Sequence, residues 1–252
     1  MNSGLLTFAT KGKAFKTFGT HQKFDREAHR LASAYIGTGF PTRKQILNFE
    51  GMGGPDGLKF KGKYTADHLW DPINEIGFLP IWIDVHYKNL VTALKLGDTQ
   101  KAAFEAGYMA HYLTDSLTPA HHLSFKLIMA GYEDSGRWRK KWLAWGGRKG
   151  PMRSHVAFET GVSSAVSFGS IHANFDPQLF KNIQKNGLPA VVKQESRSIA
   201  ELDLYQKFLR SGWTVSLAKA VKAVVVKRIP QLIAAAWVAA YAEAGHELKT
   251  KP

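Results

Sequence analysis

The sequence contains no cysteine, and this absence limits the kinds of site that it can build. Disulfide scaffolds and zinc fingers with thiolate ligands are both excluded. Any metal site must therefore use histidine, aspartate, glutamate, backbone groups or water. The composition is otherwise that of a globular protein, with 44% apolar and 12% aromatic residues among 252, and this excludes an intrinsically disordered chain.

Long apolar runs are also missing. The longest lies near Leu232–Ala242, short of the roughly 20 residues that a bilayer-spanning helix needs, and this excludes a polytopic membrane protein. Near the N-terminus the apolar patch Gly4–Ala9 is too short for a signal peptide and precedes the lysines. We therefore expect a protein that stays inside the cell or is exported by another route, and the sequence leaves the compartment open.

Acidic residues are scarce, at 20 Asp and Glu against 34 Lys and Arg, which gives a formal net charge of +14. Such an excess favours anionic partners, among them nucleic acid, phospholipid headgroups and small phosphoesters. The densest basic segment, Arg137–Arg153, holds seven cations, no acid and three tryptophans. It has three interpretations: a solvated loop whose tryptophans pack on the domain, a membrane-surface segment, or a nucleic-acid surface with bases stacked on the rings.

Apolar residues recur at helical spacing along most of the chain, and Asp98 is placed to cap a helix. The ranges with this pattern are His21–Tyr35, Asp84–Leu96, Asp98–Leu113, Ser154–Val166, Val191–Leu209, and Val215–Ala244 with an interruption at Pro230. Glycine-rich residues 50–63 and basic residues 131–153 are typical of ordered loops. Since no alternating strand pattern or internal repeat is present, we predict an all-α fold: one helical domain over residues 1–252, with a basic, tryptophan-rich insertion at about 131–153.

Two histidine–carboxylate pairs stand out among the ten histidines. His111 and Asp115 are four residues apart on a predicted helix and so share a face. His121 follows closely, and His155 and Glu159 repeat the four-residue spacing. Each pair alone could be an ordinary hydrogen bond, but together they favour ligands from different helices converging on more than one metal ion.

The stretch HYLTDSLTPAHH, from His111 to His122, resembles the H-[YF]-[LI]-G-D-x-x-x-P-[LM]-H signature of the zinc-dependent phospholipase C / P1 nuclease family. It reproduces His-x3-Asp-x5-His without a gap. His155 and Glu159 fall in HVAFETGV, which is similar to the family's His-x-x-aromatic-Glu. The helices before His111 also resemble those of bacterial phospholipases C.

Upstream segments extend the resemblance to roughly residues 21–159. TADHLWDP places a further family histidine at His68, and Asp56 lies twelve residues before it. Asp67 and Asp71, which flank His68, are the alternatives to Asp56. GTH, opening the first predicted helix, places the family's first histidine at His21.

The family implies three zinc ions in a cleft of a helical fold. One zinc would take Asp56, His68, His111 and Asp115. A second would take His121, His155 and Glu159, with His122 as the less well spaced alternative to His121. A third would take His21 and share Asp115.

The sequence departs from the family at three places. Thr114 replaces the family's glycine. The 33 residues at positions 122–154 form a longer spacer than in compact members. The family completes the third zinc with an N-terminal tryptophan, but no tryptophan precedes Trp70. A third zinc would be absent, completed by water, or bound by a terminus near Phe15–Thr20, so we expect two or three zinc ions.

The resemblance implies a phosphodiesterase that uses metal-activated water, with Asp56 as the candidate base. The pair His155 and Glu159 favours a phospholipase C acting on phospholipids, because the nucleases of the family have aspartate in place of Glu159, and the spacing from Asp56 to His68 agrees. A P1/S1-like single-strand nuclease or nucleotidase is the alternative. A third hypothesis is a non-catalytic, metal-stabilised domain that binds membranes or other anions.

Overall fold

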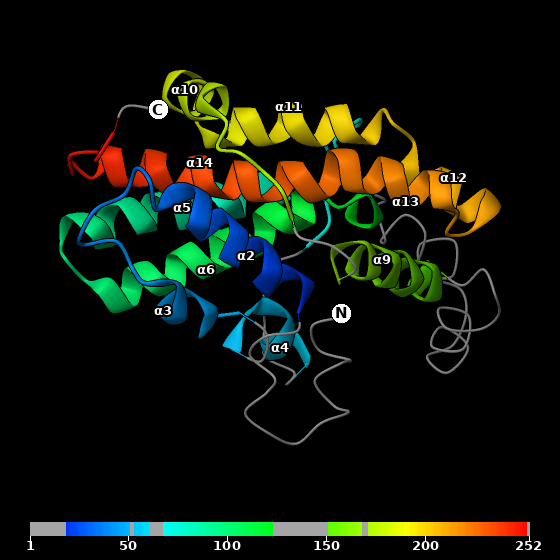
Figure 1. Ribbon diagram of the computed structural model, residues 1–252, viewed down its shortest axis with the longest axis horizontal. Helices are drawn as coiled ribbons and strands as arrows, with labels where there is room; N and C mark the ends of the chain where they lie inside the picture. The colour runs from blue at the N-terminus through cyan, green and yellow to red at the C-terminus, as the bar shows by residue number, and fades with distance from the viewer. Residues whose placement is uncertain (1–18, 51–52, 61–67, 123–150, 168–170, 251–252) are drawn as a thin grey trace.

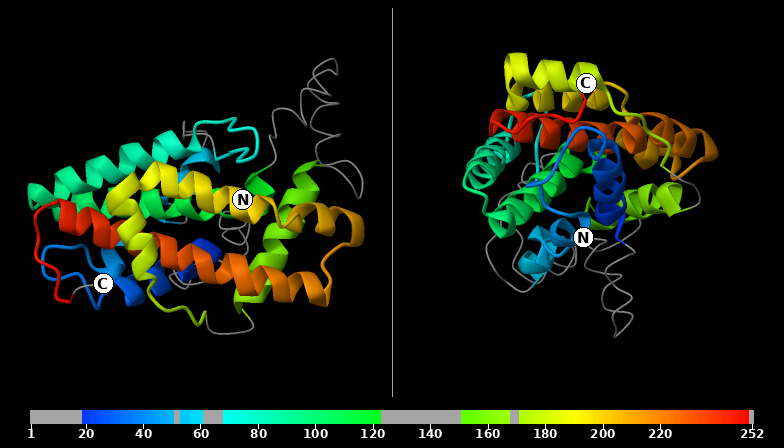
Figure 2. Two further views of the ribbon diagram at one scale, coloured as in Figure 1. Left: turned by 90° about the horizontal axis from the view of Figure 1, so that it is seen from above. Right: turned by 60° about the vertical axis from the view of Figure 1, so that its left-hand side comes forward.

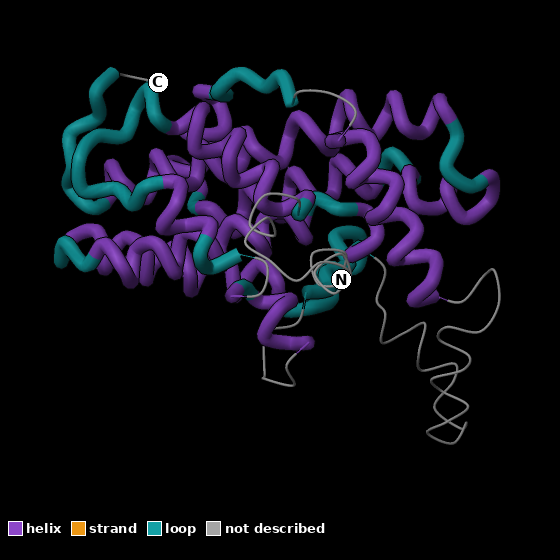
Figure 3. The backbone as a smooth tube through the Cα atoms, turned by 60° about the horizontal axis from the view of Figure 1, so that its bottom comes forward, coloured by secondary structure: helices purple, strands orange, loops and turns teal. Residues whose placement is uncertain are grey.

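The computed structural model describes residues 19–50, 53–60, 68–122, 151–167 and 171–250. Within these ranges the regular structure is helical, and the β-structure is one isolated bridge between Asp71 and Ile76 (Figure 3). The predicted all-α fold is therefore confirmed. The elements are α2 (Thr20–Ala32), α3 (Arg43–Leu47), α4 (Pro55–Phe60), α5 (Leu79–Lys95), α6 (Thr99–Ser116), the 3₁₀ turn η4 (Pro119–His121), α9 (Pro151–Ser167), α10 (Pro177–Asn186), α11 (Leu188–Ala200), α12 (Leu204–Ser211), α13 (Val215–Val221), the π-helical turn η5 (Lys222–Val226) and α14 (Lys227–Glu243).

Helices α5 and α6 begin and end where local chemistry directs. The side chain of Asp98 accepts a hydrogen bond from the backbone N–H of Lys101 at 2.9 Å, as predicted for the cap of α6. Gly97 adopts a φ of 70° directly after α5, a left-handed conformation that favours glycine. The start of α5 lies five residues before the predicted Asp84, because Pro80 fits the first turn of a helix.

Three sequence-based boundaries were wrong. The predicted helix Val191–Leu209 is two helices, α11 and α12, separated at Asp203 with a φ of 59°, a conformation that aspartate tolerates better than most residues. The predicted interruption at Pro230 is also not observed. The chain widens into the π turn η5 just before it, and such a turn accommodates the carbonyl that proline leaves without a donor. The predicted loop 50–63 contains the short helix α4.

Helix α14 is the centre of the molecule. Every residue from Leu232 to Tyr241 is buried, as expected of a helix that is apolar on all sides. Helices α2, α5, α6 and α10 all pack against α14, and α11 lies on α10 and α5 (Figure 1 and the right-hand view of Figure 2).

The helical run Val215–Glu243 is the one candidate membrane span among the described residues, by length and composition. Within its most apolar window, 72% is buried inside the fold, which is the burial of a core helix. The buried apolar side chains from α2 to α14 form one cluster. The division of the chain into domains stays a prediction.

Glycines in the segment after α3 bring the chain back toward α6. A Cβ atom added at Gly54 would lie 2.8 Å from the carbonyl oxygen of Phe49 and 3.0 Å from the Cα of Glu50. Only glycine allows this approach without a shift of the backbone. The tight turn places α4, and with it Asp56, beside α6.

Candidate metal centre

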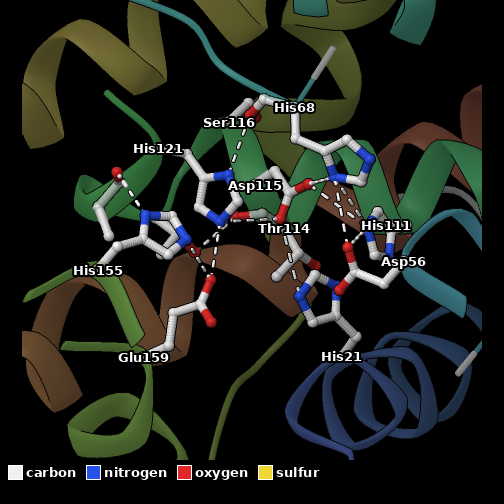
Figure 4. A network of polar contacts seen from close by, with 12 residues as sticks. His21, Asp56, His68, His111, Thr114, Asp115, Ser116, His121, His155 and Glu159 are labelled. Atoms are coloured by element: carbon white, nitrogen blue, oxygen red, sulfur yellow. Dashed lines mark hydrogen bonds and ion pairs between the residues drawn. The ribbon is translucent and has the colours of Figure 1, made fainter. Parts of the chain in front are cut away.

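The structure brings together the side chains of all eight residues predicted from the sequence. They come from α2, α4, the residue at position 68, α6, η4 and α9, and they point toward one another (Figure 4). The eight are His21, Asp56, His68, His111, Asp115, His121, His155 and Glu159. Segments as far apart in sequence as α2 and α9 therefore meet at one place.

A first group of donor atoms converges from α4, α6 and position 68. The Nδ1 atom of His68 lies 2.7 Å from Oδ2 of Asp115 and 3.3 Å from Nε2 of His111. The Nε2 atom of His111 is 3.4 Å from the same Asp115 oxygen. Oδ1 of Asp56 lies 3.8 Å from both ring nitrogens.

These separations suit a zinc ion held by four ligands. With zinc–nitrogen and zinc–oxygen bonds of about 2.0–2.1 Å in a tetrahedron, ligand atoms stand roughly 3.3 Å apart. Two imidazole nitrogens also face each other across 3.3 Å, an approach that a shared cation explains. The donors, imidazoles and carboxylates without a thiolate, fit a borderline divalent ion.

A second group gathers around α9. Oε1 of Glu159 lies 2.9 Å from Nε2 of His155 and 3.0 Å from Nε2 of His121. Asp115 joins the groups, because its Oδ1 atom is 3.4 Å from Nε2 of His121 and 3.7 Å from Nε2 of His21. One carboxylate thus faces the first group with one oxygen and the second group and His21 with the other.

Hydrogen bonds to backbone carbonyls fix which ring nitrogens face the cluster. The Nδ1–H of His121 donates to the carbonyl of His68 at 3.0 Å, and the Nδ1–H of His155 donates to the carbonyl of Ala120 at 3.2 Å. Since a neutral imidazole carries one N–H, both Nε2 atoms keep a lone pair toward the centre.

The cluster has a closed floor and a more open rim. The side chain of His111 is 0% exposed and that of Asp115 is 1% exposed. Asp56 at 13% and His155 and Glu159 at 12% each retain some access to solvent. Solvent therefore reaches the rim residues Asp56, His155 and Glu159 more than the floor residues His111 and Asp115.

The electrostatics of the centre favour positive charge. Burial lowers the pKa of His111, but the carboxylates of Glu50, Asp115 and Asp56 outweigh it and raise that pKa to about 10. Burial opposes ionisation of Asp115, but His121 and His111 outweigh it and hold its pKa below the ordinary value. A divalent cation would replace the protons that the carboxylates attract.

No protein-family model matches the chain, and no curated protein matches it in sequence. Several solved structures match it in three dimensions, among them two clostridial alpha-toxins. The alpha-toxin of Clostridium perfringens, from an avian strain, is 17% identical with a TM-score of 0.61, over 92% of this chain and 65% of the toxin chain. The alpha-toxin of Clostridium absonum is 16% identical with a TM-score of 0.65, over 94% and 67%.

This chain has the alpha-toxin fold. The likeness confirms, at the level of the fold, the predicted resemblance to zinc-dependent phospholipases C. The chain spans about two thirds of the length of the two alpha-toxins that it matches.

The structure distinguishes between the two adjacent histidines, His121 and His122, that the sequence left as alternative ligands. His121 lies in the cluster, whereas Nε2–H of His122 donates to the carbonyl of Ser116 at 2.7 Å, away from the cluster. Burial lowers the pKa of His122 to about 4. Asp71 accepts hydrogen bonds within its own turn, from the backbone N–H groups of Ile73 and Asn74. Its alternative role as a replacement for Asp56 is not supported.

Sequence reasoning missed one acidic residue at the centre. Glu50 is 3% exposed, and its Oε1 atom lies 3.0 Å from Nδ1 of His111. It belongs to no spaced motif, since 61 positions separate it from its partner. The glycines that follow it, which signal a tight turn, were the only available clue.

Three predictions lie outside the described residues, in whole or in large part. The basic segment Arg137–Arg153 is described only in its last three residues, in the first turn of α9. The N-terminal residues up to Phe18 and Asp67, the second alternative to Asp56, are not described.

Proposed function

We propose that this chain is a zinc-dependent phosphodiesterase of the phospholipase C type. The observation that carries the proposal is the position of Asp115, one oxygen of which faces His68 and His111 while the other faces His121 and His21. A carboxylate shared in this way suits adjacent metal ions, which is the arrangement that phosphodiester hydrolysis uses. The alpha-toxin fold supports the same function.

We assign the eight predicted ligands to two or three zinc ions. Asp56, His68, His111 and Asp115 would hold one zinc. His121, His155 and Glu159 would hold a second, and His21 with Asp115 would hold a third. Bound zinc would neutralise phosphate oxygens and lower the pKa of a water molecule toward 7.

Asp56 is the residue that we assign as the base. It lies at the rim, with 13% of its side chain exposed, so a substrate and a water molecule can reach it. Asp56 would take the proton of the attacking water as the water oxygen bonds to phosphorus. The bond from phosphorus to the glycerol oxygen breaks, and a proton returns to that oxygen. The products are diacylglycerol and the phosphorylated headgroup.

Two features favour a lipid substrate over nucleic acid. Glu159 is the carboxylate that pairs with His155 here, as in the phospholipases of the family, where the nucleases have aspartate. The twelve-residue spacing from Asp56 to His68 also agrees with the phospholipases. Both features belong to the ligand set, so the substrate has to be tested directly.

The test compares hydrolysis of phosphatidylcholine vesicles and of single-stranded DNA by the zinc-loaded protein. We expect release of phosphocholine, lost in His121→Asn and retained in His122→Asn, a matched change at the neighbouring buried histidine outside the cluster. Turnover of DNA alone would favour the nuclease. If neither substrate is hydrolysed although zinc is bound, the chain is a metal-stabilised binding domain and the proposal is wrong.

A further inference from the structure

A buried carboxylate contacts the back of a histidine on the floor of the centre. The side chain of Glu50 is 0% exposed, as is that of His111, and Oε1 of Glu50 lies 3.0 Å from Nδ1 of His111. The other ring nitrogen of His111, Nε2, faces His68, Asp115 and Asp56. Glu50 therefore lies on the side of the ring opposite the metal group.

The backbone is built to hold Glu50 in this place. A Cβ atom at Gly107, one turn before His111 on α6, would lie 3.2 Å from the carbonyl oxygen of Ile46 and 3.2 Å from the Cβ of Phe49. The glycine thus lets the segment that ends in Glu50 pack closely on α6. Gly54, on the other side of Glu50, folds back over the same segment.

The contact with Glu50 determines the tautomer of His111. A carboxylate oxygen accepts a hydrogen bond, so Nδ1 of His111 carries the proton and donates it, and Nε2 keeps its lone pair. His121 and His155 are held in the same tautomer by backbone carbonyls. His111 differs because a charged side chain does this task, and a carboxylate partner makes the imidazole a stronger ligand than a carbonyl does.

We propose that Glu50 is a positioning residue for the metal centre. It holds the ring of His111 by accepting the Nδ1 proton, so that Nε2 is aimed at the ion of the Asp56, His68 and Asp115 group. This inference rests on the proposed function only in that the group binds a metal. It does not depend on which phosphodiester is hydrolysed.

A neighbouring carboxyl provides a matched control. Asp25 on α2 is 1% exposed, and neither of its oxygens has a hydrogen-bond partner among the described residues. Burial and the nearby charge of Glu50 raise the pKa of Asp25 well above its ordinary value. Asp25→Asn keeps the shape of the side chain and removes a buried carboxyl from the same region, and neither oxygen of Asp25 has a hydrogen bond to lose.

The experiment measures zinc affinity of the full chain by competition with a chelator, for wild type, Glu50→Gln and Asp25→Asn. We expect Glu50→Gln to weaken zinc binding at the group that contains His111 by roughly 10- to 100-fold, as for other partners of metal-bound histidines. We expect Asp25→Asn to bind zinc as wild type does. Nitrogen NMR of the zinc-loaded protein supplies a second readout. The Nδ1–H signal of His111 should shift in Glu50→Gln and stay unchanged in Asp25→Asn.

Equal zinc affinity for wild type and Glu50→Gln, with the His111 signal unmoved, would overturn the inference. If Glu50→Gln does not fold, Gly107→Ala tests the same contact by displacing the segment that carries Glu50. Weaker zinc binding and a shifted His111 signal support the inference there, and wild-type values contradict it. Zinc binding without hydrolysis would refute the proposed function alone, because affinity is measured without substrate.

Discussion

At the scale of single residues, Asp115 has the largest predicted effect. The two oxygens of Asp115 face different donor groups, so Asp115→Asn should weaken the binding of more than one zinc ion. Glu159→Gln should weaken the binding of only the zinc ion in the second group. We expect Asp115→Asn to lower phosphodiester turnover by at least about 100-fold. Elemental analysis after dialysis and an assay of turnover measure both effects.

The control for this pair is Asp84→Asn, which changes a carboxylate in a surface ion pair with Lys88. It should retain full zinc content and activity, since surface pairs contribute at most about 1 kcal/mol to stability. Loss of the same amount of zinc in Asp115→Asn and Glu159→Gln would show that Asp115 is not shared.

The same residue scale shows what a sequence can reveal about a site. The pairs His111 with Asp115 and His155 with Glu159 were predictable, because a helix brings residues four apart onto one face. Asp56, His68 and His21 could be placed only through the family resemblance. Glu50 could not be assigned from spacing, since its contact with His111 arises from packing between two distant segments, and the glycines after it indicate only a turn.

At the scale of elements, α9 depends on one glycine. A Cβ atom at Gly161 would lie 2.3 Å from the indole ring of Trp213. Gly161→Ala should therefore push α9 away from Trp213 and cost about 1–3 kcal/mol of stability. Because α9 also carries His155 and Glu159, zinc in the second group should be bound more weakly.

Thermal unfolding and zinc affinity check the Gly161→Ala prediction, with Ser164→Ala on the same helix as the matched change of similar size. Wild-type stability in Gly161→Ala would mean that the indole can move at no cost. Local sequence also limits prediction at this scale. The cap at Asp98 was recognisable, but the break at Asp203 and the π turn at Lys222–Val226 depend on tertiary packing, which can override helix propensity.

At the scale of the whole molecule, metal removal should lower the stability of the fold without unfolding the protein. The cluster joins α2, α4, α6 and α9, while α14, at the centre of the apolar core, contributes none of the predicted ligands. Free zinc at 100 times its Kd stabilises a protein by about 2.7 kcal/mol per site, which in a chain of this size corresponds to roughly 5–10 °C in Tm. Calorimetry with chelator and with added zinc measures the difference.

We expect the chelated protein to retain most of its helical circular dichroism, because the apolar core is extensive and α14, at its centre, holds none of the predicted ligands. An unchanged Tm on chelation would contradict the assignment of the cluster as a metal site. The all-α fold itself was predictable from apolar periodicity, since that pattern depends on many residues and tolerates errors at single positions.

The turn at Gly97 has a consequence for the order in which the molecule assembles. It joins α5 directly to α6, so this hairpin can form from neighbouring residues and needs only a small loop-closure entropy. It already carries His111 and Asp115. The other predicted ligands come from other segments, which must dock on this hairpin through long-range contacts. A zinc ion bound early by the hairpin would then cross-link each docking segment to it.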